Sequence, residues 1–100
     1  MSAFLAADDA AFAAQTVAYT GSAGNTATFQ SGPNAVLVFA TTAAYVKVGV
    51  GVTATTSSTP LPANTPIIMA VPQGTGAPWR VSAIQVASGG DVYAKPGFIV

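Results

Sequence analysis

The side chains that most often perform catalysis are scarce in this sequence. It contains no histidine and no cysteine, and no glutamate occurs along the chain. Histidine is the commonest general base and metal ligand, and cysteine thiolates build structural zinc sites and disulfides. Histidine-based triads, thiolate zinc sites and disulfide frameworks are therefore excluded.

Three aspartates supply the carboxylate side chains. Asp8 and Asp9 are adjacent, so they point to opposite faces of a strand or about 100° apart on a helix, and neither arrangement pairs an acid with a base. With Asp91 added, the set still falls short of the roughly six or more oxygens that Ca²⁺ takes. We expect no catalytic residue, no metal site and no cofactor.

Two glycine pairs and one lysine complete the search for chemistry. Gly49-Val50-Gly51 and Gly74-Thr75-Gly76 lack the strand, loop and helix context of a phosphate-binding loop, so they indicate turns or a bulge. Lys47 has no neighbour in the sequence that would mark it as a Schiff-base nucleophile. We expect that the protein is not an enzyme.

Aromatic side chains are the remaining candidates for recognition, because they bring large contact area at low entropic cost. On a strand, Tyr45 shares its face with Lys47, and Tyr93 shares its face with Asp91 and Lys95. Both tyrosines are therefore expected to be at least partly exposed and are candidate contact residues.

The single tryptophan is expected to lie in the core. Trp79 shares a strand face with Val81 and Ala83, and both of these favour burial. Arg80 and Ser82 then point outward, which makes Arg80 a candidate interface residue.

Charge is unusually sparse. Charged residues make up 6% of the chain and the formal net charge is zero, against about 25% charged residues in ordinary soluble domains. Three separated cations, Lys47, Arg80 and Lys95, cannot form the basic patch that nucleic-acid binding requires. A weakly charged surface has little repulsion between copies, which suits a protein that functions in an assembly.

Short strands separated by turn residues predict an all-β fold. Gly, Pro, Asn and Ser clusters punctuate the chain, and about seven or eight strands in one domain indicate a single antiparallel β-sandwich or jelly roll. The expected strands are Gln15–Thr20, Thr26–Phe29, Ala35–Ala40, Ala44–Val50, Pro66–Val71, Trp79–Val86 and Val92–Lys95, with Phe98–Val100 as a further candidate.

Two of these strands are apolar on both faces. In Ala35–Ala40, Val36 and Val38 point one way while Leu37 and Phe39 point the other. Pro66–Val71 has the same character, with Ile67 and Met69 opposed to Ile68. A single sandwich has one core layer, so the second face requires a folded-back arm, a loop or another subunit. We favour another subunit.

A third strand alternates between apolar and polar faces. The valines at positions 46, 48, 50 and 52 share one face, which predicts a half-buried strand. The following segment, Thr53–Asn64, has few apolar residues and two prolines. It is expected to form a long surface loop or edge, either solvated or in contact with a partner.

The first 14 residues differ from the rest and are treated as an arm, with residues 15–100 as the β-sandwich domain. Phe4 to Ala14 is rich in alanine and is expected to form either a short helix that places Phe4, Leu5 and Phe12 roughly on one side, or an extended arm. Neither a cleavable signal peptide nor a membrane-spanning segment is expected, because no basic leader or long apolar run occurs.

The order of features from Asn34 to Gly97 resembles a group of small virion proteins of tailed bacteriophages. The resemblance rests on an apolar strand followed by Tyr45-Val46-Lys47-Val48-Gly49, the Thr-rich segment from Val52, Pro60-Leu61-Pro62-Ala63, Met69-Ala70-Val71-Pro72-Gln73-Gly74, Ser82-Ala83-Ile84-Gln85-Val86 and Asp91-Val92-Tyr93-Ala94-Lys95-Pro96-Gly97. The arm, Ser2 to Ala14, is not part of the pattern.

This resemblance implies a capsid decoration, or cement, protein made in the host cytoplasm. Such a protein binds the major capsid protein on the outside of the shell between capsomers and associates with itself as a small symmetric oligomer, without nucleic acid or membrane. The candidate interface residues are Phe4, Leu5, Phe12, Leu37, Phe39, Tyr45, Arg80 and Tyr93.

Three alternatives stay open at this point. The protein is a neck, tail or head-fibre component of the same particle, or a module that binds host glycans through exposed Tyr and Trp, or a soluble β-domain outside any particle. Copy number separates the first from decoration, and loss of sugar binding on changing Tyr45 or Tyr93 to Ala identifies the second.

Overall fold

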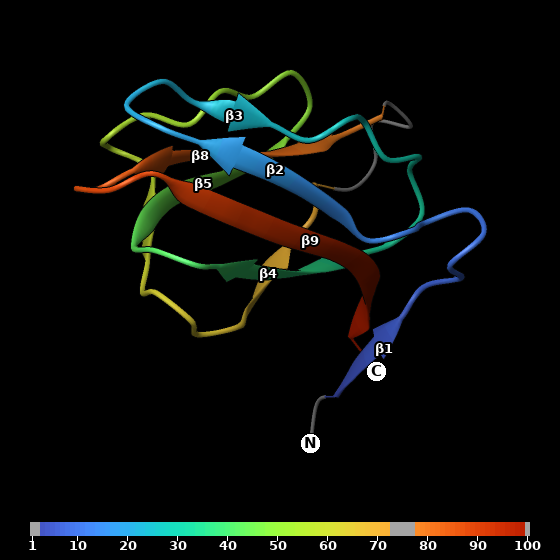
Figure 1. Cartoon of the computed structure of the whole chain (residues 1–100). Coiled ribbons are helices and arrows are strands. Elements are labelled where there is room, and N and C mark those ends of the chain that lie inside the picture. The colour runs from blue at the N-terminus through green and yellow to red at the C-terminus, as the bar shows by residue number, and fades with distance from the viewer. Residues whose placement is uncertain (1–2, 73–77, 100) are drawn as a thin grey trace.

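Two antiparallel β-sheets packed face to face form the fold (Figure 1). The computed structural model describes residues 3–72 and 78–99, and none of these residues is helical. The predicted all-β sandwich class is therefore confirmed. Most of the turn expected between Pro72 and Pro78, including Gly74-Thr75-Gly76, lies outside the described residues, as does Val100 at the end of the last expected strand.

The first sheet is built around the longest strand, β9, which pairs with β4 on one side and with β2 and then β1 on the other. The strand β7 lies beyond β4 at the edge. We call this sheet A; its strands are β1 (Phe4–Ala6), β2 (Gln15–Tyr19), β4 (Ala35–Ala40), β7 (Ile67–Ala70) and β9 (Gly90–Ile99).

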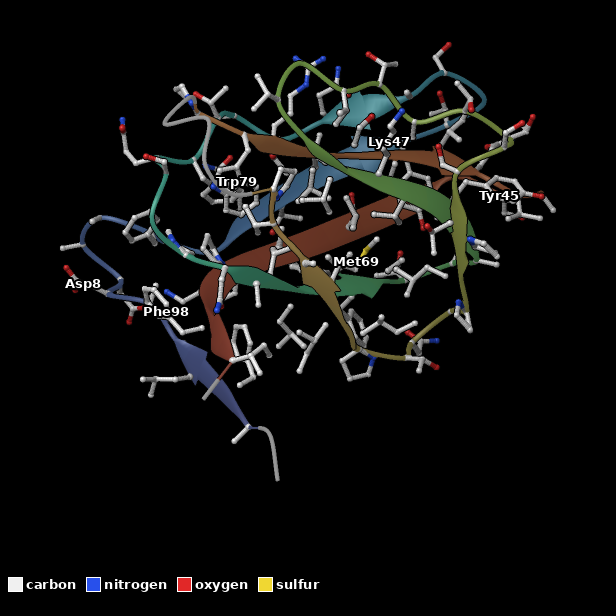
Figure 2. All side chains as sticks on the ribbon, turned by 180° about the vertical axis from the view of Figure 1, so that it is seen from behind. Asp8, Tyr45, Lys47, Met69, Trp79 and Phe98 are labelled. Atoms are coloured by element: carbon white, nitrogen blue, oxygen red, sulfur yellow. The ribbon has the colours of Figure 1, made fainter. Side chains whose placement is uncertain are left out.

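The second sheet, sheet B, has the order β3-β8-β5-β6. Its strands are β3 (Gly24–Asn25), β5 (Ala44–Gly49), β6 (Thr59–Leu61) and β8 (Arg80–Gln85). Inward side chains of both sheets form one core, in which Trp79 is 1% exposed and packs on the ring of Phe29 at 4.7 Å between ring centroids. Figure 2 shows Trp79 between the two layers, so its expected core position is confirmed.

The strand expected at Thr26–Phe29 does not form as a continuous element. Pairing with β8 begins two residues earlier, in β3, and Phe29 forms an isolated bridge with Trp79. Between them, the Thr26 hydroxyl accepts the backbone N–H of Val81 at 3.0 Å, while Val81 C=O accepts the N–H of Thr26. This side-chain bond replaces a ladder bond and lets the chain bend away from β8.

The two strands expected at the C-terminal end are one strand, because Pro96 is accommodated inside β9. A proline usually interrupts a central strand by removing a donor. Here the carbonyl of Pro96 accepts the N–H of Ala7, and the nitrogen of Pro96 faces the same side of β9 as this carbonyl. On that side the chain passes from β1 to β2. The missing donor therefore falls in a gap between two partner strands.

The arm is extended at its start, and the helix considered for Phe4 to Ala14 is absent. β1 pairs with β9 of the same chain, and the ring of Phe4 lies over Gly97, where an added Cβ would be 2.4 Å from the ring. An Asx-type turn follows, in which the N–H of Ala10 donates to the Asp8 carboxylate. Pairing with β9 provides hydrogen-bond partners for the backbone N–H and C=O groups of β1, which a helix would have paired within itself.

The expected loop Thr53–Asn64 contains the strand β6 and also covers the outer face of sheet B. Ser82, which was expected to point outward, does lie on that outer face, but it is fully buried under the loop. Its hydroxyl accepts the N–H of Ala54 at 2.7 Å. The expected outward direction of Ser82 is confirmed, but its burial was not predicted, because alternation along a strand cannot show whether a distant loop folds over it.

The half-buried strand expected from Tyr45 to Val52 ends at Gly49. Val46 is buried and Val48 is half-buried, as the alternation predicts, but Val50 is exposed. Gly51 has a φ of +63°, a value that glycine adopts readily, and the chain turns there. The turn carries the following residues toward the outer face of sheet B.

Candidate docking surface

The described residues contain no group of three or more acidic, histidine or cysteine side chains that would hold a metal ion. No helix long and apolar enough to cross a membrane occurs in the same part of the chain. What the fold presents instead is a sheet face, so the candidate site is a surface.

Sheet A buries one face in the core, and its other face is partly exposed within the described chain. Cross-strand pairing places Leu37 beside Ile68 on one side and Lys95 on the other, and it places Phe39 beside Tyr93. The rings of Phe39 and Tyr93 are 6.1 Å apart between centroids. Since side chains alternate between faces, these residues all project away from the core.

The same face continues to the end of the sheet. Ile99 pairs with Phe4, whose ring covers Gly97. Ile68 is 45% exposed, Tyr93 43% and Ile99 37%. We call this set the apolar sheet face, which comprises Phe4, Leu37, Phe39, Ile68, Tyr93 and Ile99.

One charged side chain that lies within this face is neutralised locally. The Lys95 ammonium donates to the carboxylate of Asp9 and to the backbone carbonyl of Phe12, the latter at 2.8 Å. These bonds fasten the turn after β1 to the sheet and leave Lys95 half-buried. The cation therefore interrupts the apolar sheet face less than its charge would suggest.

The same contact predicts a pH effect on the arm. The hydrogen bond from Lys95, followed by the charge of its ammonium, lowers the pKa of the Asp9 carboxyl below its ordinary value of 3.8. A carboxyl whose pKa is lower in the folded state favours that state above its unfolded pKa, and this contribution is lost as pH falls through the folded value. We expect the arm to loosen only below about pH 4.

NMR titration of the Asp9 carboxyl measures this effect. We expect Lys95→Met to raise the pKa of Asp9 toward its ordinary value and to speed hydrogen exchange at the N–H of Ala7, which is bonded to Pro96. An unchanged Asp9 titration in the Lys95→Met variant would show that the ion pair does not form in solution.

Four of the sequence-predicted interface residues come together on the apolar sheet face: Phe4, Leu37, Phe39 and Tyr93. The other four do not join them. Leu5 pairs with Phe98 and so projects to the opposite side of β1, where it is 56% exposed, and Phe12 is half-buried in the turn close to Gly32.

Tyr45 and Arg80 lie on sheet B, away from the apolar sheet face. Tyr45 is half-buried between Ile84 of β8 and Pro60 of β6. The Arg80 guanidinium donates to the carbonyl of Val52 at 2.8 Å and to the hydroxyl of Thr53. Arg80 therefore fastens the loop that covers sheet B.

Two residues of the apolar sheet face were not among the sequence candidates. Ile68 could have been included, because it opposes Ile67 and Met69 on a strand that is apolar on both sides. Ile99 had no such signal, since its position depends on β9 continuing through Pro96.

Comparison of the chain with protein-family models, with curated proteins and with solved structures finds no match.

Proposed function

We propose that this protein is a non-catalytic structural component of a tailed-phage virion that decorates the capsid exterior and docks through the apolar sheet face. The observation that supports this proposal is the row of apolar side chains on the outer face of sheet A. In this row Ile68 and Tyr93 are exposed and Leu37 and Phe39 are half-buried within the described chain. The major capsid protein and a second copy of this chain are its proposed partners.

Docking would act by mass action. Burial of apolar surface contributes roughly 25 cal/mol per Å², and a ligand that binds only the assembled shell stabilises that shell. The sparse charge of the chain lowers the desolvation cost of such an interface. No bond is made or broken, in keeping with a protein that has no histidine, cysteine or glutamate.

The glycan-binding alternative has less support from the geometry. Its two best candidates, Tyr45 and Tyr93, project from different sheets, so a single sugar ring cannot stack on both. A neck, tail or head-fibre role uses the same apolar sheet face and differs from decoration only in copy number.

A binding assay with matched variants tests the docking face. Purified protein is added to particles that lack it, and bound protein is measured after sedimentation. We expect Ile68→Lys to weaken binding at least tenfold, about 1.4 kcal/mol, because it places a charge at the most exposed side chain of the apolar sheet face. Val86→Lys is the control, since Val86 is 47% exposed but follows β8 in sheet B.

Equal binding by the two lysine variants would contradict docking through sheet A. Failure of the unmodified protein to bind any particle would contradict the virion proposal itself.

A further inference from the structure

The two sides of the sandwich are closed to different degrees. On one side the chain crosses from β2 to β3, and the N–H of Gln85 in sheet B donates to the carbonyl of Thr20 at 3.0 Å. The hydroxyl of Tyr19 donates to the carbonyl of Thr42 on the same side. On the opposite side the chain crosses from β6 of sheet B to β7 of sheet A, and the N–H of Asn64 in this crossing donates to the carbonyl of Ala40 at 2.8 Å. Beyond that point, along β7 itself, no further backbone hydrogen bond joins the two sheets among the described residues.

On this open side, β7 presents a free edge. The N–H of Val71 donates to the carbonyl of Asn34, which shows that Val71 and, by alternation, Met69 direct their backbone groups toward β4. Ile68 and Ala70 therefore direct their N–H and C=O groups away from the sheet. Neither has a backbone partner on that side within the described chain.

The facing strand β5 is also incompletely paired. β6 pairs with β5 only as far as Val46 and Thr59. The chain before Thr59 curls into a tight turn, in which the N–H of Ser58 donates to the carbonyl of Thr55. Val48 lies two residues beyond Val46, so its N–H and C=O groups point to the same side of β5 as those of Val46. No residue of β6 pairs with Val48, and its backbone groups therefore face the open side.

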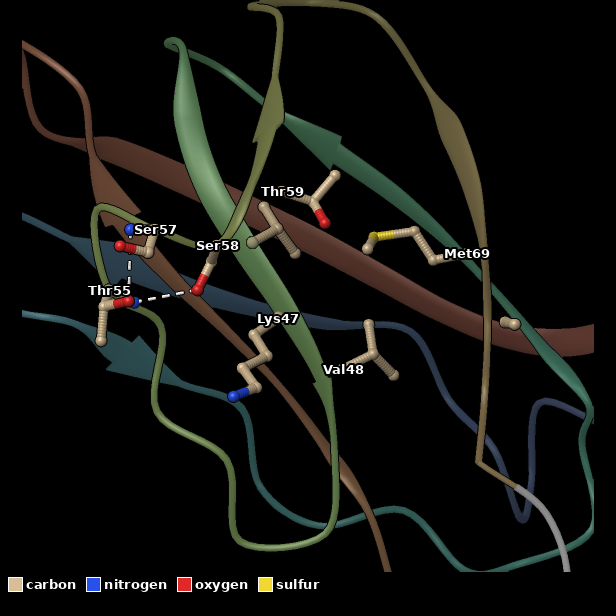
Figure 3. A pocket seen from close by; sticks show the side chains of 9 residues that line it. Lys47, Val48, Thr55, Ser57, Ser58, Thr59 and Met69 are labelled. Carbon is tan, nitrogen blue, oxygen red and sulfur yellow. Dashed lines mark hydrogen bonds between the residues drawn. The ribbon is translucent and has the colours of Figure 1, made fainter.

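A pocket of about 360 Å³ lies between these two edges. Figure 3 shows Met69 from β7 and Val48 from β5 on its two walls. Ser57, Thr59 and Lys47 also line it, with Lys47 on the opposite face of β5 from Val48. We call this pocket and the two flanking edges the open seam.

Lys47 gives the open seam a positive charge. Within the described residues it has no acidic partner, whereas Lys95 is paired with Asp9 and Arg80 donates to the loop carbonyl of Val52. A carboxylate on an incoming group would therefore find an uncompensated cation at the rim.

We propose that the open seam binds an extended polypeptide segment of a partner, which adds as a strand to the free edge of β7. Backbone groups of Ile68 and Ala70 supply the ladder bonds, because an extended chain is the ligand that matches alternating N–H and C=O groups. Apolar side chains of the segment contact Met69 and Val48, and an Asp or Glu side chain pairs with Lys47. This site borders the apolar sheet face, because the side chain of Ile68 belongs to that face while its backbone belongs to the open seam.

Selection from a randomised library of eight-residue peptides, followed by affinity measurement on the intact protein, tests the proposal. We expect enrichment of alternating apolar peptides with one acidic residue. Lys47→Gln should weaken their binding about fivefold, in line with a partly exposed charge pair. Ala70→Pro should weaken it at least tenfold, because proline removes the outward N–H but no bond to β4.

Ala70→Ser is the matched control, since it keeps the N–H at the same position. A ¹H–¹⁵N correlation spectrum of each variant verifies folding before affinity is compared. The proposal is overturned if no acidic peptides are enriched, or if their affinity is the same for folded Ala70→Pro and Ala70→Ser. The Ile68→Lys variant tests particle docking and is not used to test peptide binding. The Ala70 and Lys47 variants alone test whether the open seam binds peptides.

Discussion

Replacement of Trp79 by alanine is expected to lower the free energy of unfolding by about 3–5 kcal/mol, the range for truncating a buried Trp or Phe. Trp79 is 1% exposed and packs on Phe29. Its indole N–H donates to the carbonyl of Gln30 at 3.1 Å, so alanine removes both the packing and a hydrogen bond. A loss of this size is a large part of the roughly 5–15 kcal/mol that stabilises typical domains.

Urea unfolding followed by far-ultraviolet circular dichroism measures this change. Trp79→Phe is the control, because it keeps an aromatic ring on Phe29 while it loses the bond to Gln30 and the part of the indole that a phenyl ring does not fill. We expect the phenylalanine variant to retain most of the lost stability. A decrease below about 1 kcal/mol for Trp79→Ala would show that this residue is not in a close-packed core.

The second large effect is expected at Tyr19, on the closed side of the sandwich. Tyr19 is 2% exposed, and its hydroxyl donates to the carbonyl of Thr42 at 2.7 Å and accepts the N–H of the same residue. The Thr42 hydroxyl donates in turn to the carbonyl of Ser88. Tyr19 thus ties β2 to the two turns that follow β4 and β8.

Tyr19→Ala is expected to cost about 3–5 kcal/mol, since it empties a ring-sized volume of the core. Tyr19→Phe keeps the ring and leaves the backbone of Thr42 without its partner, which costs about 1–3 kcal/mol. Hydrogen exchange at the N–H of Thr42 reports the lost hydrogen bond and should accelerate in both variants. The difference in unfolding free energy between the two variants then reports the lost packing of the ring. Equal stability of Tyr19→Phe and the unmodified protein would mean that water replaces the hydroxyl.

Much of the fold follows from local patterns in the sequence. The expected strand Ala35–Ala40 is β4 as it stands, and the alternation of Val36 and Val38 with Leu37 and Phe39 correctly indicates two different faces. Trp79 was expected in the core on the same grounds. Periodicity gives the orientation of side chains along one strand, because the pleat alternates strictly.

Long-range contacts account for what the sequence could not show. Ser82 is buried because the loop after Gly51 returns over β8, and Pro96 lies inside β9 because its missing donor meets a gap between β1 and β2. The arm is a strand because β9 has a free edge for it. Each outcome depends on a partner segment far away in the chain.

The candidate surface could be predicted in part. Four of its six residues, Phe4, Leu37, Phe39 and Tyr93, were already candidate interface residues in the sequence. That Phe4, Ile68 and Ile99 extend it depends on which strands are neighbours in sheet A. The open seam depends on where β6 leaves β5, which has no local sequence signal.

The copy number of this chain per particle tests the decoration proposal most directly. Quantitative mass spectrometry of purified phage particles whose genome encodes it compares copies of this chain with copies of the major capsid protein. Decoration of the shell predicts a ratio near one to one or a simple fraction of it. A few copies per particle would contradict decoration in favour of a neck, tail or head-fibre position, and complete absence would contradict a virion role.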